Sequence, residues 1–173
     1  MEISSIAVLG AGQMGNGIAQ VAACAGYNVM MIDIEQSYVD RGMSAIEFSL
    51  SKLVSKERMT QEEADAALAR VRVSTSNESA SQSDLVIEAI PEIPEIKFST
   101  FEELDTICKQ EAILASNTSS ISIDEIAAST NRPERVIGMH FMNPVPVMKL
   151  VEIINGSKTT EEINTAVVNA AER

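Results

Sequence analysis

The sequence has no tryptophan, and aromatic residues make up only 3% of it. Basic residues are also scarce, because 13 Lys and Arg stand against 25 Asp and Glu, which gives a net charge of -12. Proteins that bind nucleic acid without sequence preference need a basic face and aromatic platforms for the bases. We therefore expect no nucleic-acid partner.

Cysteines and long apolar runs are also lacking. The two cysteines, Cys24 and Cys108, fall in apolar helical segments without the spacing of metal ligands. We interpret both as buried core residues in a reducing compartment, and expect neither a disulfide nor a metal site. No apolar run approaches the roughly 20 residues of a membrane-spanning helix, and the first residues lack the basic start of a secretory signal. These absences predict a cytoplasmic protein without a membrane partner.

A glycine pattern near the amino terminus carries the clearest functional signal. Gly10, Gly12 and Gly15 form a G-x-G-x-x-G turn directly after an apolar run, and Asp33 closes the next apolar run. This turn between a strand and a helix, with an acid about 20 residues further on, indicates a dinucleotide site. The first glycine permits the turn, the second lets the pyrophosphate approach, and the third lets the helix pack closely on the strand.

The residues around this turn favour NAD over NADP. Gln13 and Met14 begin a helix whose free N–H groups would face the phosphates. Asp33 would accept hydrogen bonds from the ribose hydroxyls and repel a 2′-phosphate, while Ile34 and Glu35 supply no arginine to bind one. The alternative role for Asp33 is to cap the following helix.

Apolar runs and helical patterns alternate along the chain, which predicts an α/β fold: a Rossmann-type, doubly wound, mostly parallel sheet. A helical insertion follows the second strand, and an antiparallel strand lies near the carboxyl terminus. We expect strands at residues 3–9, 28–33, 71–74, 85–90, 112–116, 135–141 and 147–154. Helices are expected at residues 13–25, 36–56, 60–69, 96–108 and 123–129 and from residue 159 onward.

His140 is the only histidine, so imidazole chemistry must use it. If the strands on either side of Pro146 fold back on one another, His140 and Glu152 become register partners whose side chains can meet. A carboxylate on one ring nitrogen fixes the tautomer and stabilises the imidazolium that forms when the other nitrogen takes a proton. The spacing alone is equally compatible with a structural histidine.

Two polar segments follow neighbouring strands. Asn117 and Ser119 come after the fifth strand, where they could touch the nicotinamide and a substrate oxygen; helix capping is the plainer alternative. Glu92 and Lys97 follow the fourth strand and would flank the nicotinamide-side ribose, with a surface ion pair as the plainer alternative.

Four segments, residues 10–15, 88–90, 115–120 and 140–152, resemble the L-3-hydroxyacyl-CoA dehydrogenase family, with the bacterial 3-hydroxybutyryl-CoA dehydrogenases the nearest members. The resemblance implies NAD-dependent oxidation of an L-3-hydroxyacyl-CoA to the 3-ketoacyl-CoA, and the reverse. It makes His140 the general base, oriented by Glu152, with Ser119 on the reacting oxygen and Asn143 in the same pocket. The implied cofactor contacts are Asp33, Ala89, Ile90, Glu92, Lys97 and Asn117, and Ser49 and Lys56 would meet the CoA.

The sequence departs from the family pattern in two ways. It has Glu92-Ile93-Pro94 where relatives often continue Glu-Asn, which leaves the loop shape open. The family's further active-site asparagine and dimer contact belong to a helical domain that would lie beyond Arg173. We therefore expect residues 1–173 to be the NAD-binding domain of a longer, homodimeric enzyme. An NAD-binding module inactive in isolation, and a hydroxy-acid or sugar-acid dehydrogenase that does not use CoA, remain alternatives.

Overall fold

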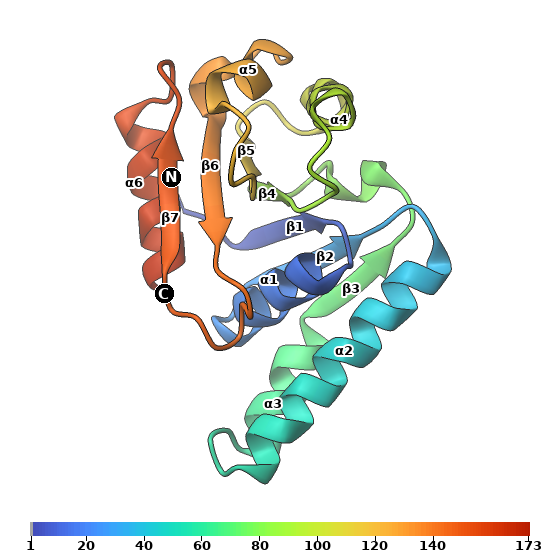
Figure 1. The fold of residues 1–173 in the computed structure, drawn as a ribbon. Coiled ribbons are helices and arrows are strands. Elements are labelled where there is room, and N and C mark those ends of the chain that lie inside the picture. The colour runs from blue at the N-terminus through green and yellow to red at the C-terminus, as the bar shows by residue number, and fades with distance from the viewer. Residues whose placement is uncertain (1) are drawn as a thin grey trace.

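A seven-stranded sheet forms the centre of the computed structural model, which describes residues 2–173 (Figure 1). The strand order is β3-β2-β1-β4-β5-β6-β7, with β1 to β6 parallel and β7 antiparallel to β6. The strands are β1 (Ser5–Leu9), β2 (Asn28–Ile32), β3 (Val71–Ser74), β4 (Leu85–Glu88), β5 (Ile113–Ser116), β6 (Val136–Phe141) and β7 (Val151–Asn155). This order confirms the predicted doubly wound, Rossmann-type fold.

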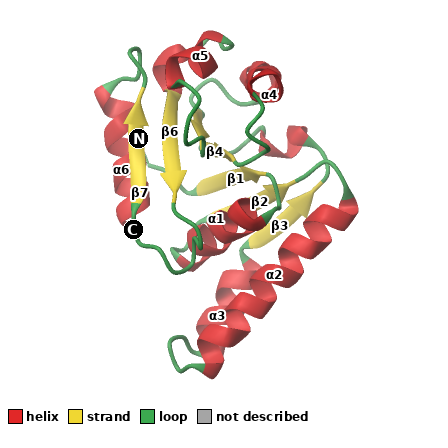
Figure 2. Ribbon diagram, in the orientation of Figure 1, coloured by secondary structure: helices red, strands yellow, loops and turns green. Residues whose placement is uncertain are grey.

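Helices cover both faces of the sheet (Figure 2). They are α1 (Gln13–Cys24), α2 (Gln36–Ser55), α3 (Gln61–Ala69), α4 (Pro94–Ile107), α5 (Ile123–Ala128) and α6 (Glu161–Glu172), with short 3-10 turns η1 (Asn77–Ala80) and η2 (Pro133–Arg135). The insertion after β2 is the pair α2 and α3, which lie side by side and extend beyond the sheet (Figure 1). A capping box starts α3: the side chain of Thr60 accepts a hydrogen bond from the backbone N–H of Glu63, and the side chain of Glu63 accepts one from the backbone N–H of Thr60.

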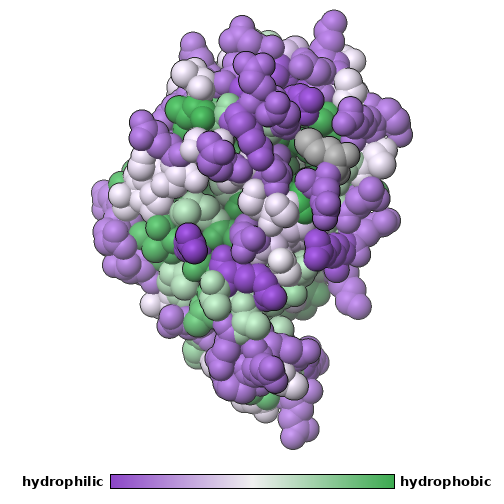
Figure 3. All heavy atoms as spheres, turned by 180° about the vertical axis from the view of Figure 1, so that it is seen from behind, coloured by the Kyte–Doolittle hydropathy of each residue, from purple (hydrophilic) through white to green (hydrophobic). Residues whose placement is uncertain are grey.

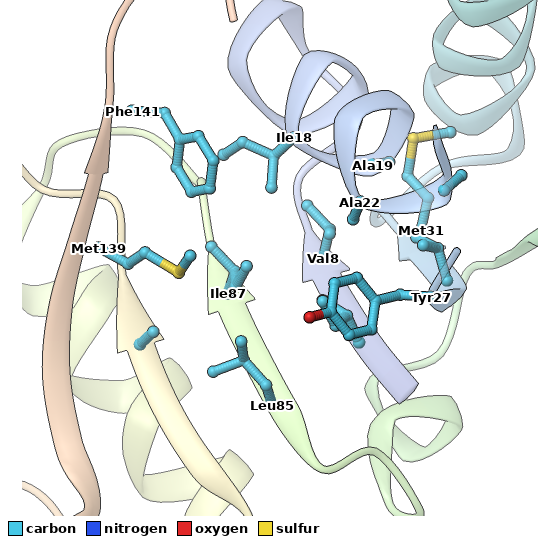
Figure 4. Packing of buried hydrophobic residues seen from close by; sticks show 14 of the residues in the cluster. Val8, Ile18, Ala19, Ala22, Tyr27, Met31, Leu85, Ile87, Met139 and Phe141 are labelled. Carbon is cyan, nitrogen blue, oxygen red and sulfur yellow. The ribbon is translucent and has the colours of Figure 1, made fainter. Parts of the chain in front are cut away.

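The core consists of two layers, because successive strand residues point to opposite faces. In β1, Ile6 and Val8 pack with α1, α2, α3 and α6, whereas Ala7 and Leu9 pack with α4 and α5. Figure 4 shows the first layer, where Ile18 of α1 faces the sheet. Both layers fix the sheet, and with it the carboxyl ends of its strands.

Two predicted boundaries shift for identifiable reasons. Helix α4 begins at Pro94 rather than residue 96, because proline fits the first turn of a helix, where its missing N–H is not needed. The last strand begins at Val151 rather than residue 147. Residues 147–150 instead form an exposed segment after the proline turn, with Val147 72% and Leu150 57% exposed.

The two cysteines differ in burial, which corrects one interpretation. Cys108 is buried as predicted, and burial raises the pKa of its thiol to about 11. Cys24 is exposed, because it lies at the last position of α1, where the helix leaves the core.

The face of the molecule that lies behind the view of Figure 1 is mostly hydrophilic, with smaller apolar areas between the polar side chains (Figure 3). None of the helices in residues 2–173 has the length and apolar character needed to cross a membrane.

Candidate cofactor and active site

The carboxyl ends of five neighbouring parallel strands bring the predicted site residues to one edge of the sheet. Asp33 follows β2, Gly10 follows β1, Ala89 follows β4, Asn117 follows β5, and His140 lies near the end of β6. The strand order places these five strands side by side. Ligands of open α/β sheets bind at this edge, so the predicted residues lie where one ligand site is expected.

The glycine turn has the geometry that a dinucleotide needs. Gly10 has a φ of +100°, and a Cβ there would lie 2.5 Å from the carbonyl oxygen of Ala89. A Cβ on Gly15 would lie 1.8 Å from the oxygen of Gly10, so only glycine allows the helix this close to the turn. Around Gly12, by contrast, a Cβ would meet nothing within 4 Å. The space left at Gly12 fits a pyrophosphate at the start of α1.

Asp33 ties the second strand to this turn. Its Oδ2 accepts a hydrogen bond from the backbone N–H of Ala11 at 2.7 Å, and its Oδ1 accepts one from Ile34 at 2.7 Å. Helix α2 is capped at Glu35, so the alternative role of Asp33 as the cap of that helix is wrong. A cleft of about 650 Å³ lies over Gly12 and Asp33.

Arg41 also lines this cleft, one position that the sequence reasoning missed. A cofactor arginine is expected directly after Asp33, where this chain has Ile34 and Glu35. Because α2 turns once every 3.6 residues, the side chains of Tyr38 and Arg41 both reach the cleft. The guanidinium of Arg41 lies 4.9 Å from the centre of the Tyr38 ring.

His140 and Glu152 meet as the register about Pro146 predicted. They are paired residues in the antiparallel ladder of β6 and β7, and Nδ1 of His140 lies 2.8 Å from Oε2 of Glu152. The side chains are 23% and 52% exposed, so both reach solvent at the mouth of the site. With Nδ1 donating to the carboxylate, Nε2 is the ring nitrogen that remains for proton transfer.

The loop after β5 and the proline turn complete this edge. Asn117 accepts a hydrogen bond from the backbone of Phe141 at 2.8 Å, which joins β5 to the end of β6. Ser119 is exposed in the same loop. Asn143 accepts a hydrogen bond from Gln13 at 3.2 Å, so the proline turn lies against the start of α1.

Comparison with known proteins identifies the family. Residues 5–173 match the model described as 3-hydroxyacyl-CoA dehydrogenase, NAD binding domain. The chain belongs to this family. It is 50% identical over 173 residues to the probable 3-hydroxybutyryl-CoA dehydrogenase of Bacillus subtilis, covering 100% of this chain and 60% of that protein. It is 41% identical over 163 residues to the 3-hydroxyadipyl-CoA dehydrogenase of Escherichia coli, covering 94% of this chain and 34% of that protein.

Solved structures give the same assignment. The crystal structure of (S)-3-hydroxybutyryl-CoA dehydrogenase from Ralstonia eutropha has a TM-score of 0.97 and 44% sequence identity, and covers 99% of this chain and 60% of that chain. This chain therefore spans about 60% of the length of the Bacillus subtilis and Ralstonia eutropha relatives and about a third of the Escherichia coli protein. The match supports NAD as the cofactor, and the space at Gly12 and the position of Asp33 fit it.

A buried carboxylate at the end of β4 is a feature of this NAD-binding domain that the sequence reasoning did not assign. Glu88 is 0% exposed and pairs with Lys97, which is 1% exposed, at 2.5 Å. The plainer reading of Glu92 and Lys97 as a surface ion pair is therefore wrong in part, because the lysine is buried. The sequence signal for this pair is the acidic residue at the end of an apolar strand, where a charge needs a buried partner.

Some of the remaining predicted residues lie beside the glycine turn, and others lie outside the cleft at Gly12. Ala89 and Ile90 are half-buried directly after β4, beside the glycine turn. Ser49 is half-buried on α2, Lys56 directly after α2 is exposed, and neither lines the cleft at Gly12. A separate apolar cleft of about 470 Å³ lies between α1, α6 and the proline turn, and none of the predicted catalytic residues lines it.

Proposed function

We propose that this NAD-binding domain serves the reversible oxidation of an L-3-hydroxyacyl-CoA to the 3-ketoacyl-CoA, with 3-hydroxybutyryl-CoA as the substrate. The observation that carries the proposal is the 2.8 Å pair of His140 and Glu152 on the sheet edge that also holds the glycine turn. Relatives named for 3-hydroxybutyryl-CoA support the substrate.

His140 acts as the general base in this proposal. Its Nε2 accepts the proton of the substrate hydroxyl, and Nδ1 keeps its hydrogen bond to Glu152, whose charge stabilises the imidazolium. NAD, when bound, accepts the hydride from the carbon that carries this hydroxyl. In the reverse direction, Nε2 returns the proton to the ketone oxygen.

Other side chains orient the two ligands. Ser119 donates a hydrogen bond to the reacting oxygen, Asn143 lies in the same pocket, and Asn117 and Glu92 border the nicotinamide half of the cofactor. Ser49 on α2 and Lys56 directly after α2 meet the CoA; the charge of Lys56 suits the phosphates of the CoA. The full-length enzyme acts as a homodimer in the cytoplasm, with no nucleic-acid or membrane partner.

The experiment follows NADH absorbance with acetoacetyl-CoA. It compares this chain with a fusion that adds the carboxyl-terminal remainder of the Bacillus subtilis relative. We expect turnover in the fusion and little or none in the chain alone, because the relatives are longer by the part that would complete the substrate site. Activity of the fusion on free hydroxy acids but not on acetoacetyl-CoA would favour the dehydrogenase that does not use CoA. Cofactor binding without any turnover would favour a binding module.

Replacing Asp33 by alanine should weaken NADH binding and raise the affinity for NADPH relative to NADH by about tenfold, or about 1.4 kcal/mol. The variant lacks the carboxylate that repels the 2′-phosphate of NADPH, and Arg41, which lines the same cleft, can then pair with this phosphate. Fluorescence titration with both reduced cofactors measures the ratio.

The double variant with Arg41→Gln is the control for this prediction. It should lose the gain in NADPH affinity but keep the weaker NADH binding. An unchanged preference in the Asp33→Ala variant would contradict the assignment of Asp33 to the adenosine ribose.

A further inference from the structure

Helix α1 carries a glycine outside the dinucleotide turn. Gly17 lies in the interior of α1, two residues after Gly15, and is buried. Glycine inside a helix is less favourable than alanine, because its backbone loses more conformational freedom on folding. A glycine at this position therefore needs a reason in the packing around it. The cofactor cleft does not supply that reason, since Gly17 does not line it.

The proline turn between β6 and β7 packs directly on this glycine. A Cβ on Gly17 would lie 2.8 Å from Cβ of Val145 and 3.2 Å from its Cγ2. Because the Cβ of Val145 is bonded to the backbone, a change of rotamer cannot move it away. Val145 is 4% exposed, and it is the one buried residue of the segment 142–150. One side chain thus packs the turn against α1, and glycine is the residue that leaves room for it.

A second contact joins α1 to the same turn. Gln13 lies four residues before Gly17, so the two residues share one face of the helix. Nε2 of Gln13 donates a hydrogen bond to Oδ1 of Asn143 at 3.2 Å, and Gln13 also lines the cofactor cleft. One face of α1 therefore borders both the cofactor cleft and the turn that follows His140.

We infer that Gly17 is a positioning residue: by admitting Val145, it sets the distance between the proline turn and α1, and so places Asn143 against Gln13. The turn then has its position before substrate arrives, and a side chain misplaced by about 1 Å can cost about 100-fold in rate. The role of Asn143 in the substrate pocket rests on the proposed function, whereas the link between α1 and the turn rests on the contacts alone.

The test replaces Gly17 by alanine. Alanine favours a helix, so the change would stabilise the protein if Gly17 had no role in packing; with that role, the methyl group displaces the turn. The N–H groups of Val147 and Met148 both donate to the carbonyl of Pro144 at 3.0 Å, and we expect their hydrogen exchange to accelerate by about tenfold or more.

Catalysis by the fusion described above gives the second measurement. In Gly17→Ala, kcat/KM for acetoacetyl-CoA should fall by at least about tenfold, because the turn that carries Asn143 has moved. The dissociation constant and the KM of NADH should change by less than about threefold, because Gly17 lies outside the cofactor cleft. Loss of stability alone would not separate the two ligands in this way.

Val145→Ala changes the same contact from the side of the turn. It leaves α1 unaltered and removes most of the side chain that is buried against it. The same measurements apply, with the same expected changes, so this variant decides the question if Gly17→Ala does not fold.

The matched control is Gly156→Ala. A Cβ on Gly156 would lie 2.9 Å from Oδ1 of Asp124, which is a similar crowding. Gly156 follows the end of β7, which pairs with the start of β6, so it lies at the edge of the sheet away from the site. This variant should leave kcat/KM and the exchange of Val147 and Met148 unchanged.

The inference fails if exchange at Val147 and Met148 is unchanged in Gly17→Ala and Val145→Ala, or if it accelerates while kcat/KM is kept. A loss of NADH affinity beyond about tenfold in Gly17→Ala would make Gly17 part of the cofactor site and would also overturn it. If the unaltered fusion does not reduce acetoacetyl-CoA, the proposed function fails, while the exchange measurement still decides whether Gly17 sets the turn.

Discussion

Replacing His140 by alanine is expected to slow turnover by roughly 100- to 10,000-fold, the range typical of a lost general base. NADH affinity should stay within about threefold, because His140 does not line the cleft over Gly12 and Asp33. Stopped-flow measurement of NADH oxidation with acetoacetyl-CoA in the fusion protein separates the chemical step from binding.

Glu152→Gln is the companion variant for this prediction. The amide can still accept a hydrogen bond from Nδ1 but cannot stabilise an imidazolium by charge, so turnover should fall while the fold is kept. Because Glu152 is half exposed on an edge strand, its loss should cost little stability. Turnover that survives the loss of His140 would show that another group takes the proton.

Replacing Gly12 by valine should abolish NADH binding with little effect on the fold. A Cβ at this position meets nothing within 4 Å, and Gly12 has an ordinary extended conformation at the start of α1. The side chain would instead occupy the space of the pyrophosphate, so we expect a loss of at least about 100-fold in affinity, or about 2.7 kcal/mol. Calorimetric titration with NADH and denaturant unfolding measure the two quantities.

Gly15→Ala provides the contrast. Its Cβ would fall 1.8 Å from the carbonyl oxygen of Gly10, so this change should lower the free energy of unfolding, whereas Gly12→Val should leave it within about 1 kcal/mol. Retained NADH binding in Gly12→Val would place the pyrophosphate elsewhere.

Sequence patterns predicted most of the fold because they are local. Short continuous apolar runs mark the buried strands, and the glycine spacing marks the turn into α1, so the sheet and its helices follow without tertiary information. The pairing of His140 with Glu152 also followed, because a proline turn at residue 146 fixes which residues of an antiparallel pair face each other.

What the sequence did not predict depends on packing between distant segments. The burial of Lys97 depends on Glu88 and Ser116, which lie on two different strands. The position of Arg41 beside Gly12 depends on how α2 packs against α1. The exposure of residues 147–150 follows from the absence of any strand partner until Val151. None of these can be obtained from spacing along the chain.

The most direct test is a crystal structure of the fusion protein with NADH and acetoacetyl-CoA. We expect the pyrophosphate over Gly12 and the ketone oxygen within about 2.6–3.2 Å of Nε2 of His140, with Glu152 still on Nδ1. A nicotinamide ring bound away from His140, or a ketone oxygen held by another side chain, would contradict the account.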